Sequence, residues 1–104
     1  SNVELMDGVK DVNVYNKIFE AVEKVPGASN PHRVRSRMIG NRYIITLDIE
    51  VNPQITITQA HEIAGAVEKS IESSIDNVYD ILVHVEPAGE CQTDEKFGVD
   101  KDMV

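Results

Sequence analysis

The feature that most constrains the fold is a pair of alternating segments, residues 32–39 and 43–51, on either side of Gly40-Asn41. Successive side chains of a β-strand point to opposite faces, so alternating apolar and polar residues predict a strand with one buried face. A Gly-Asn pair between two such segments is typical of a hairpin turn. Because an isolated hairpin is at best marginally stable in water, its apolar face needs cover from other elements.

Two amphipathic helices are predicted to supply that cover. The first begins with Asp11 as its N-cap and ends at Pro26-Gly27, with apolar residues recurring at helical spacing between them. The second starts at Thr56 and Gln59, which are spaced as in a capping box, and it ends at Asp76-Asn77. The second helix carries an apolar stripe along one side, and such a stripe packs against one face of a sheet.

A third strand is predicted over residues 78–86, with Pro87 ending it. A right-handed crossover from the hairpin through the second helix makes this strand parallel to the strand at 43–51. With both helices on one face, the sequence predicts an α+β fold, a two-layer α-β-β-α-β sandwich around a three-stranded mixed sheet. This arrangement is ferredoxin-like, with the first strand of that fold missing.

Composition narrows the class of function. The chain has 104 residues, which suits one domain, and its formal net charge of −8 disfavours nucleic acid as a partner while attracting cations. Cys91 is the only cysteine, so an internal disulfide and a CxxC motif are both excluded. No nucleophile with a nearby base and no glycine-rich phosphate loop is recognisable. We therefore predict that the protein is not an enzyme.

Histidines and acids on the strands are candidate metal ligands. His84 and Glu86 stand two residues apart, side by side on the polar face of the third strand. His32 at the start of the first strand and Asp48 near the end of the second are neighbours in a hairpin. Strict alternation, however, puts His32 on the face of Val34, opposite to Asp48, unless His32 lies where the chain leaves the strand. Imidazole nitrogens and carboxylate oxygens are ligands that zinc prefers.

His61, in the first turns of the second helix, is a weaker candidate for a metal ligand when the residues alone are considered. Its context, HEIAG, is not the HExxH motif of zinc proteases, because Gly65 stands where the second histidine is required. A histidine near the positive end of a helix dipole can also be an ordinary surface residue.

Three arginines share the polar face of the first strand, namely Arg33, Arg35 and Arg37. Cross-strand pairing with Asp48 and Glu50 explains them more simply than a phosphate site does.

Five pieces of sequence in the same order resemble one family. They are LMDG at 5–8, VPG at 25–27, HRVRSRMIGNRYIITLDIEVNP at 32–53, QAHEIAGAVEKSI at 59–71 and VHVEP at 83–87. The combination resembles the C-terminal cytoplasmic domain of the cation diffusion facilitator, or cation efflux, transporters. Any one of these pieces alone would be a weak signal, whereas the spaced combination is specific.

The resemblance implies an organisation and a function. Residues 1–10 would be a linker after a membrane domain, residues 11–87 a metal-binding and dimerisation domain, and residues 88–104 an acidic, flexible tail. The family exports divalent cations, mostly zinc but also manganese, iron, cobalt or cadmium. Its soluble domain is metallochaperone-like in fold and forms a homodimer on the cytoplasmic side of the cell membrane. Metal binding there favours transport by the membrane domain of the same chain.

The resemblance also implies the metal ligands. By position these are His32, Asp48, His61, His84 and Glu86. Asp48 stands where zinc-binding relatives often have histidine, and a carboxylate there moves the site toward harder ions such as manganese or iron. Two alternatives stay open, a purely structural dimerisation domain without a functional metal site, and a soluble ferredoxin-like metal carrier.

Overall fold

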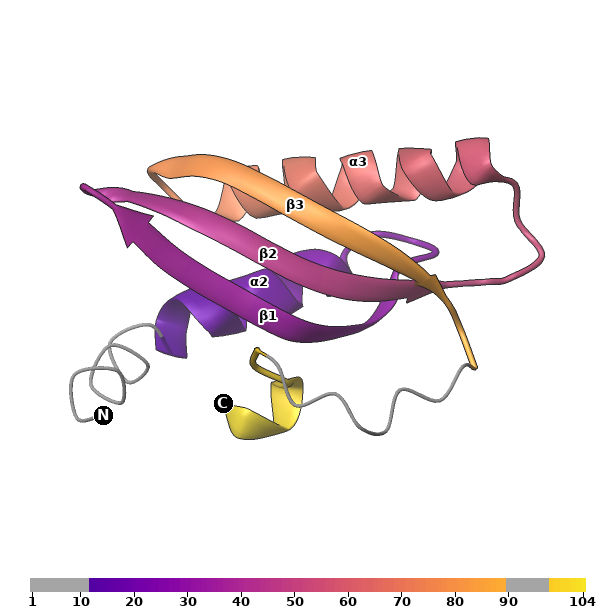
Figure 1. Cartoon of the computed structure of the whole chain (residues 1–104), viewed down its shortest axis with the longest axis horizontal. Helices are drawn as coiled ribbons and strands as arrows, with labels where there is room; N and C mark the ends of the chain where they lie inside the picture. The colour runs from indigo at the N-terminus through magenta and orange to yellow at the C-terminus, as the bar shows by residue number, and fades with distance from the viewer. Residues whose placement is uncertain (1–11, 90–97) are drawn as a thin grey trace.

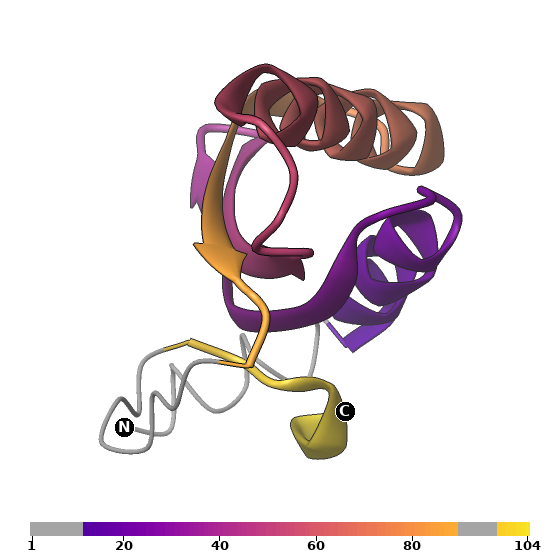
Figure 2. The ribbon, with the colours of Figure 1, turned by 90° about the vertical axis from the view of Figure 1, so that its right-hand side faces the viewer.

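A three-stranded sheet with two helices on one face forms the body of the chain (Figures 1 and 2). The structure is a computed structural model that describes residues 12–89 and 98–104. The elements are α2 (Val12–Glu23), β1 (Ser29–Ile39), β2 (Arg42–Val51), α3 (Ile57–Ser74), β3 (Val78–Pro87) and a short 3-10 helix (Lys101–Met103). The predicted α-β-β-α-β order and the predicted fold class are confirmed. The predicted N-cap of the first helix, Asp11, lies outside the described residues.

The sheet has the order β1-β2-β3. β1 and β2 form the predicted antiparallel hairpin, and β2 and β3 are parallel, as a crossover through α3 requires. The central strand, β2, therefore has a hydrogen-bonded neighbour on each side. Figure 2 shows both helices on the same side of the curved sheet, which leaves the other face uncovered by regular structure among the described residues.

The core lies between the sheet and the helices. Alternate residues of β2 point into it, and Ile45, Leu47 and Ile49 are almost completely buried. From the helices, Ile18 and Val67 are fully buried as well. Burying a side chain of this size contributes about 1.5–3 kcal/mol, so this aliphatic layer is a main source of stability and holds β2 in a fixed position.

A capping box fixes the start of α3, as predicted. The Thr56 hydroxyl accepts a hydrogen bond from the Gln59 backbone N–H at 3.0 Å, and the Gln59 side-chain oxygen accepts one from the Thr56 N–H at 2.9 Å. Both contacts satisfy backbone donors that a helix N-terminus otherwise leaves without partners.

β1 departs from regular strand geometry at two places. Its pairing with β2 shifts register between Ser29 and His32 and again between His32 and Arg35. Asn30 and Arg33, one in each interval, have positive φ angles of 48° and 49°. These are β-bulges, each of which adds one residue to β1 without a counterpart on β2.

The bulges change the faces that β1 residues occupy. His32 pairs directly with Asp48, so both side chains stand on the face away from the helices, whereas Val34 is fully buried in the core. The expectation that strict alternation puts His32 on the face of Val34 is therefore wrong. The extra residue at the Arg33 bulge reverses the alternation, because it lets His32 and Arg33 both reach the outer face.

Residues 98–104 pack beside β1 and α2. Val99 forms an isolated antiparallel bridge with Val34, through hydrogen bonds of 3.0 and 2.7 Å, and Lys101 forms an ion pair with Glu23 at 2.7 Å. The flexible tail expected over 88–104 stays a prediction, and residues 90–97 lie outside the described part. Among the described residues, no helix has the length and apolar character needed to cross a membrane.

Candidate metal centre

Acidic and imidazole side chains gather on the outer face of the sheet, toward the C-terminal ends of β2 and β3. The parallel register places Asp48 beside His84 and Glu50 beside Glu86. Asp48 and Glu86 are buried although charged, each with 7% of its surface exposed. Buried carboxylates need compensating charge or hydrogen bonds, so their surroundings show what the site can hold.

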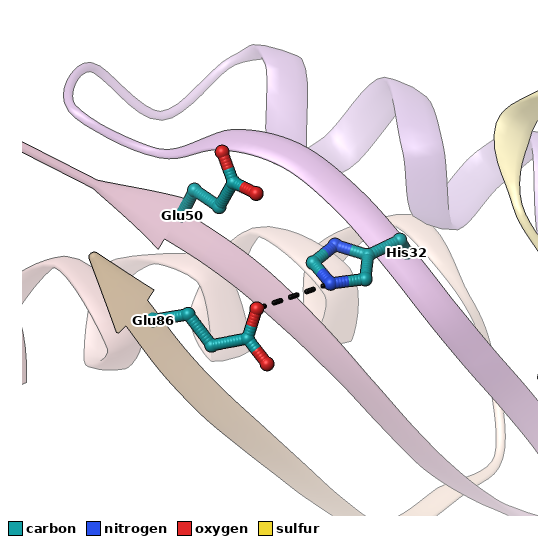
Figure 3. A group of neighbouring side chains, drawn as sticks. All are labelled: His32, Glu50 and Glu86. Carbon is teal, nitrogen blue, oxygen red and sulfur yellow. Dashed lines mark ion pairs between the residues drawn. The ribbon is translucent and has the colours of Figure 1, made fainter. Parts of the chain in front are cut away.

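The tautomer of His32 is fixed by the backbone. Its Nδ1 lies 2.7 Å from the carbonyl oxygen of Asn30, and since a carbonyl can only accept, Nδ1 carries a proton and donates it. In the neutral ring Nε2 then has a free lone pair, and it faces Glu86 Oε1 at 3.2 Å (Figure 3). A backbone hydrogen bond on the far nitrogen is the usual support of a metal-binding histidine.

Glu86 Oε1 has an unusual environment. It is buried and has no hydrogen-bond partner in the described part of the chain, although His32 Nε2 is near. His32 Nε2 and Glu86 Oε1 are 3.2 Å apart, which is close enough for an ion pair. The relative orientation of the two groups, however, does not meet the geometry of a hydrogen bond. A neutral imidazole nitrogen and a carboxylate oxygen are both acceptors, so a cation placed between them satisfies both. The residues present therefore fit a metal ion.

Two groups of three ligands meet the distance requirement for a cation. One is Asp48, His84 and Glu86, and the other is His32, Glu50 and Glu86; within each group the ligand atoms lie within 4.8 Å of one another. Glu86 belongs to both. Figure 3 shows the second group, with Glu50 and Glu86 on neighbouring strands and His32 on β1. Imidazole and carboxylate donors without thiolate suit zinc and harder divalent ions.

His84 approaches both buried acids. Its Nδ1 lies 3.6 Å from Asp48 Oδ1 and 3.4 Å from Glu86 Oε2, while 61% of its side chain is exposed. The two acids thus form the floor of the first group, and His84 lies at its solvent side.

Arg33 is already paired with the acids of that first group. Its Nε donates to Asp48 Oδ2 at 2.5 Å, its Nη2 also pairs with Asp48 Oδ2, and Nη2 lies 3.5 Å from Glu86 Oε2. The predicted pairing of the β1 arginines with Asp48 is therefore found for Arg33. Glu50 accepts a hydrogen bond from the Asn30 side chain at 2.8 Å.

Sequence reasoning named most of this cluster but not all of it. The structure brings together His32, Asp48, His84 and Glu86, whereas His61 is exposed on α3, which packs on the other face of the sheet, and belongs to neither group. Glu50 was missed as a candidate ligand. The available signal was its position two residues after Asp48, on the same face of β2 and next to Glu86 across the parallel pair.

An open depression beside the cluster connects it to solvent. It is lined by Arg33, Thr46, Leu47, Asp48, Leu82 and His84. Leu82, next to Thr46 on the same outer face, is 65% exposed. The site thus adjoins an apolar surface, and no helix or strand among the described residues covers that surface.

Comparison with known proteins gives a match to a family model over most of the chain. The model described as "Cation efflux protein, cytoplasmic domain" matches residues 9–88, and this description is that of a transporter domain rather than an enzyme. Metal tolerance protein 2 of Oryza sativa subsp. japonica is 31% identical over 85 residues, 82% of this chain and 22% of the rice protein. The manganese efflux system protein MneS of Bacillus subtilis is 31% identical over 91 residues, 84% of this chain and 29% of MneS. The chain thus spans less than a third of either relative.

A solved structure shares the fold. The metal-bound C-terminal domain of the CzcD transporter from Thermotoga maritima superposes with a TM-score of 0.75 at 36% identity, covering 80% of this chain and 96% of that domain. A cadmium form of a MamM C-terminal domain variant gives a TM-score of 0.71 at 34% identity, covering 74% of this chain and 96% of the variant.

Proposed function

Since the chain belongs to the cation efflux protein family, as its cytoplasmic domain, we propose that it binds a divalent cation on the outer sheet face and dimerises around it. The observation that carries the proposal is the pair of acceptors, His32 Nε2 and Glu86 Oε1, which face each other at 3.2 Å without a hydrogen bond between them. A bound cation stabilises whichever conformation and assembly binds it best. In a full-length transporter, that preference would favour transport by the membrane domain of the same chain, from the cytoplasmic side of the membrane.

Zinc is the first candidate, with manganese, iron, cobalt and cadmium as alternatives. The donors are imidazoles and carboxylates, a set that zinc accepts at about 2.0–2.2 Å and that manganese and iron also accept. A relative named for manganese efflux and a cadmium form of a structural relative support a site that is not restricted to one ion. Asp48 in place of a histidine shifts the preference toward the harder ions.

Dimerisation supplies what one copy lacks. Each group offers three protein ligands, while a structural zinc site takes four. A second copy placed over the outer face would cover Leu82 and could contribute the fourth ligand. His61 is the candidate for that role, because it is exposed and lies outside both groups of its own chain.

A purely structural dimerisation domain is the alternative that a specific observation favours. The pair between Arg33 and Asp48 already neutralises one buried acid without any metal. A soluble metal carrier has no comparable support.

Calorimetric titration with zinc and with manganese separates the two proposals. Glu86→Gln removes a ligand common to both groups, so we expect the binding heat of the wild-type chain to disappear in this variant. The matched control is Glu72→Gln, which removes the same charge from an exposed position on α3 and should bind as the wild type does. Wild-type heat that is absent, or equal in Glu86→Gln and Glu72→Gln, would leave the structural domain as the better account.

A further inference from the structure

Arg33 occupies the place where one group of ligands would receive a metal. Its Nη2 contacts Asp48 Oδ2 and lies 3.5 Å from Glu86 Oε2, the same oxygen that His84 Nδ1 approaches at 3.4 Å. The guanidinium side chain is itself 19% exposed, so much of its charge is withdrawn from solvent. A cation placed among Asp48, His84 and Glu86 would meet this guanidinium at both carboxylates.

The second group is arranged differently. His32 faces Oε1 of Glu86, whereas Arg33 faces Oε2. The carboxylate thus offers one oxygen to the arginine and keeps the other, which has no hydrogen-bond partner within the described residues, for the side of His32 and Glu50.

The backbone of Arg33 is held from the other side by the C-terminal segment. Its N–H donates to Asp100 Oδ1 at 3.3 Å, and the next residue, Val34, bridges to Val99. Gly98 lies so close that a Cβ added there would be 2.6 Å from the Arg33 carbonyl oxygen. The positive φ of Arg33 is therefore fixed by contacts on its backbone as well as by the bulge. The arginine is an ordered part of the site rather than a loose surface side chain.

We propose that the Arg33 side chain competes with the metal for Asp48 and Glu86. Arg33 must leave both carboxylates before a cation can occupy the Asp48–His84–Glu86 group. This inference rests on the proposed function of the same site. A divalent ion replaces one positive charge by two, but it must first break charge-assisted hydrogen bonds that stabilise the metal-free state. Arg33 thus sets the concentration of metal at which this group fills, whereas the His32–Glu50–Glu86 group fills without displacing it.

Whether zinc affinity rises or falls when Arg33 is replaced tests the proposal. Arg33→Gln should bind zinc about tenfold or more tightly than the wild type in calorimetric titration, because a charge-assisted competitor has been removed. A residue that merely supports the site would weaken binding when replaced. Arg37→Gln is the matched control, since Arg37 lies on the same strand opposite Ile44, is exposed, and loses the same charge on substitution. We expect its affinity to stay within about twofold of the wild type, because exposed charges are screened by salt.

Two further variants keep the test decisive. Arg33→Lys retains the charge but not the planar fork, so it should show an affinity between wild type and Arg33→Gln, and it serves if the glutamine variant does not fold. Adding His84→Ala to Arg33→Gln should abolish the gain, because the proposal assigns it to the group that contains His84.

The possible outcomes distinguish the role of Arg33 from metal binding itself. Binding by wild type with equal or weaker binding by Arg33→Gln overturns the role of Arg33 and leaves the proposed function intact. Binding by Arg33→Gln alone supports the competitor role and overturns metal binding by the natural sequence. Absence of binding in every variant overturns both.

Discussion

Among single residues, Glu86 connects the parts of the site, because its two carboxylate oxygens face different neighbours. Oε1 faces His32, and Oε2 faces Arg33 and His84. Since the side chain is buried at the end of β3, next to Glu50, it cannot turn freely toward solvent. One carboxylate therefore takes part in two possible cation positions, and its state affects both.

A second residue, Gly98, is important for its lack of a side chain. Alanine at this position would force the C-terminal segment away from Arg33, and we expect the two hydrogen bonds between Val34 and Val99 to be lost. Hydrogen exchange of the Val34 amide should then accelerate by about tenfold or more, as expected when a protected amide opens locally.

Gly89→Ala is the control for this prediction. Gly89 has a φ of +93°, close to the +86° of Gly98, but a Cβ added there meets nothing within 4 Å. Both variants thus carry a similar backbone penalty, and only one carries the clash. Equal exchange rates at Val34 in the two variants would contradict the assigned role of Gly98.

At the level of elements, the capping box gives α3 a fixed beginning directly after β2. Thr56→Ala removes an acceptor from the helix N-terminus and should lower the free energy of unfolding by about 1 kcal/mol in urea denaturation. Thr58→Ala, two residues later and exposed, should change stability by less than half of that. Similar losses in both variants would show that the capping hydrogen bonds contribute little.

The elements themselves could be predicted because their signals are local. β2 alternates without interruption, and the residues of the capping box stand at the required spacing, so sequence reasoning found the hairpin, α3 and the parallel third strand. It also named four of the candidate ligands that these elements bring together, namely His32, Asp48, His84 and Glu86. Strand periodicity is sufficient where a strand is regular.

β1 could not be predicted in the same way. Its bulges fall at Asn30 and Arg33. Asparagine is enriched at positive φ angles, but arginine is not, so nothing in the local sequence marks the bulge at Arg33. The contacts that hold Arg33 come from Asp100 and Gly98, far later in the chain. A pattern of alternating residues cannot include such contacts, and for that reason strict alternation alone puts His32 on the wrong face.

At the level of the whole molecule, the two faces of the sheet differ in character, because one is apolar and buried and the other carries polar and charged side chains. The inner face and both helices form an aliphatic core that keeps the strands in place. The outer face presents the candidate ligands and exposed Leu82, and no regular structure in the described part of the chain covers them. Stability and the proposed metal binding thus depend on different sides of the same three strands, and a second copy could bind the outer face without disturbing the core.

The most direct test of the central claim is sedimentation of the wild-type chain and of Glu86→Gln, with and without added zinc. If the outer face binds a cation between two copies, zinc will shift the wild-type chain from monomer toward dimer, and Glu86→Gln will sediment alike in both conditions. A sedimentation coefficient that zinc leaves unchanged in the wild type, or changes equally in the variant, would contradict metal-dependent dimerisation at this site.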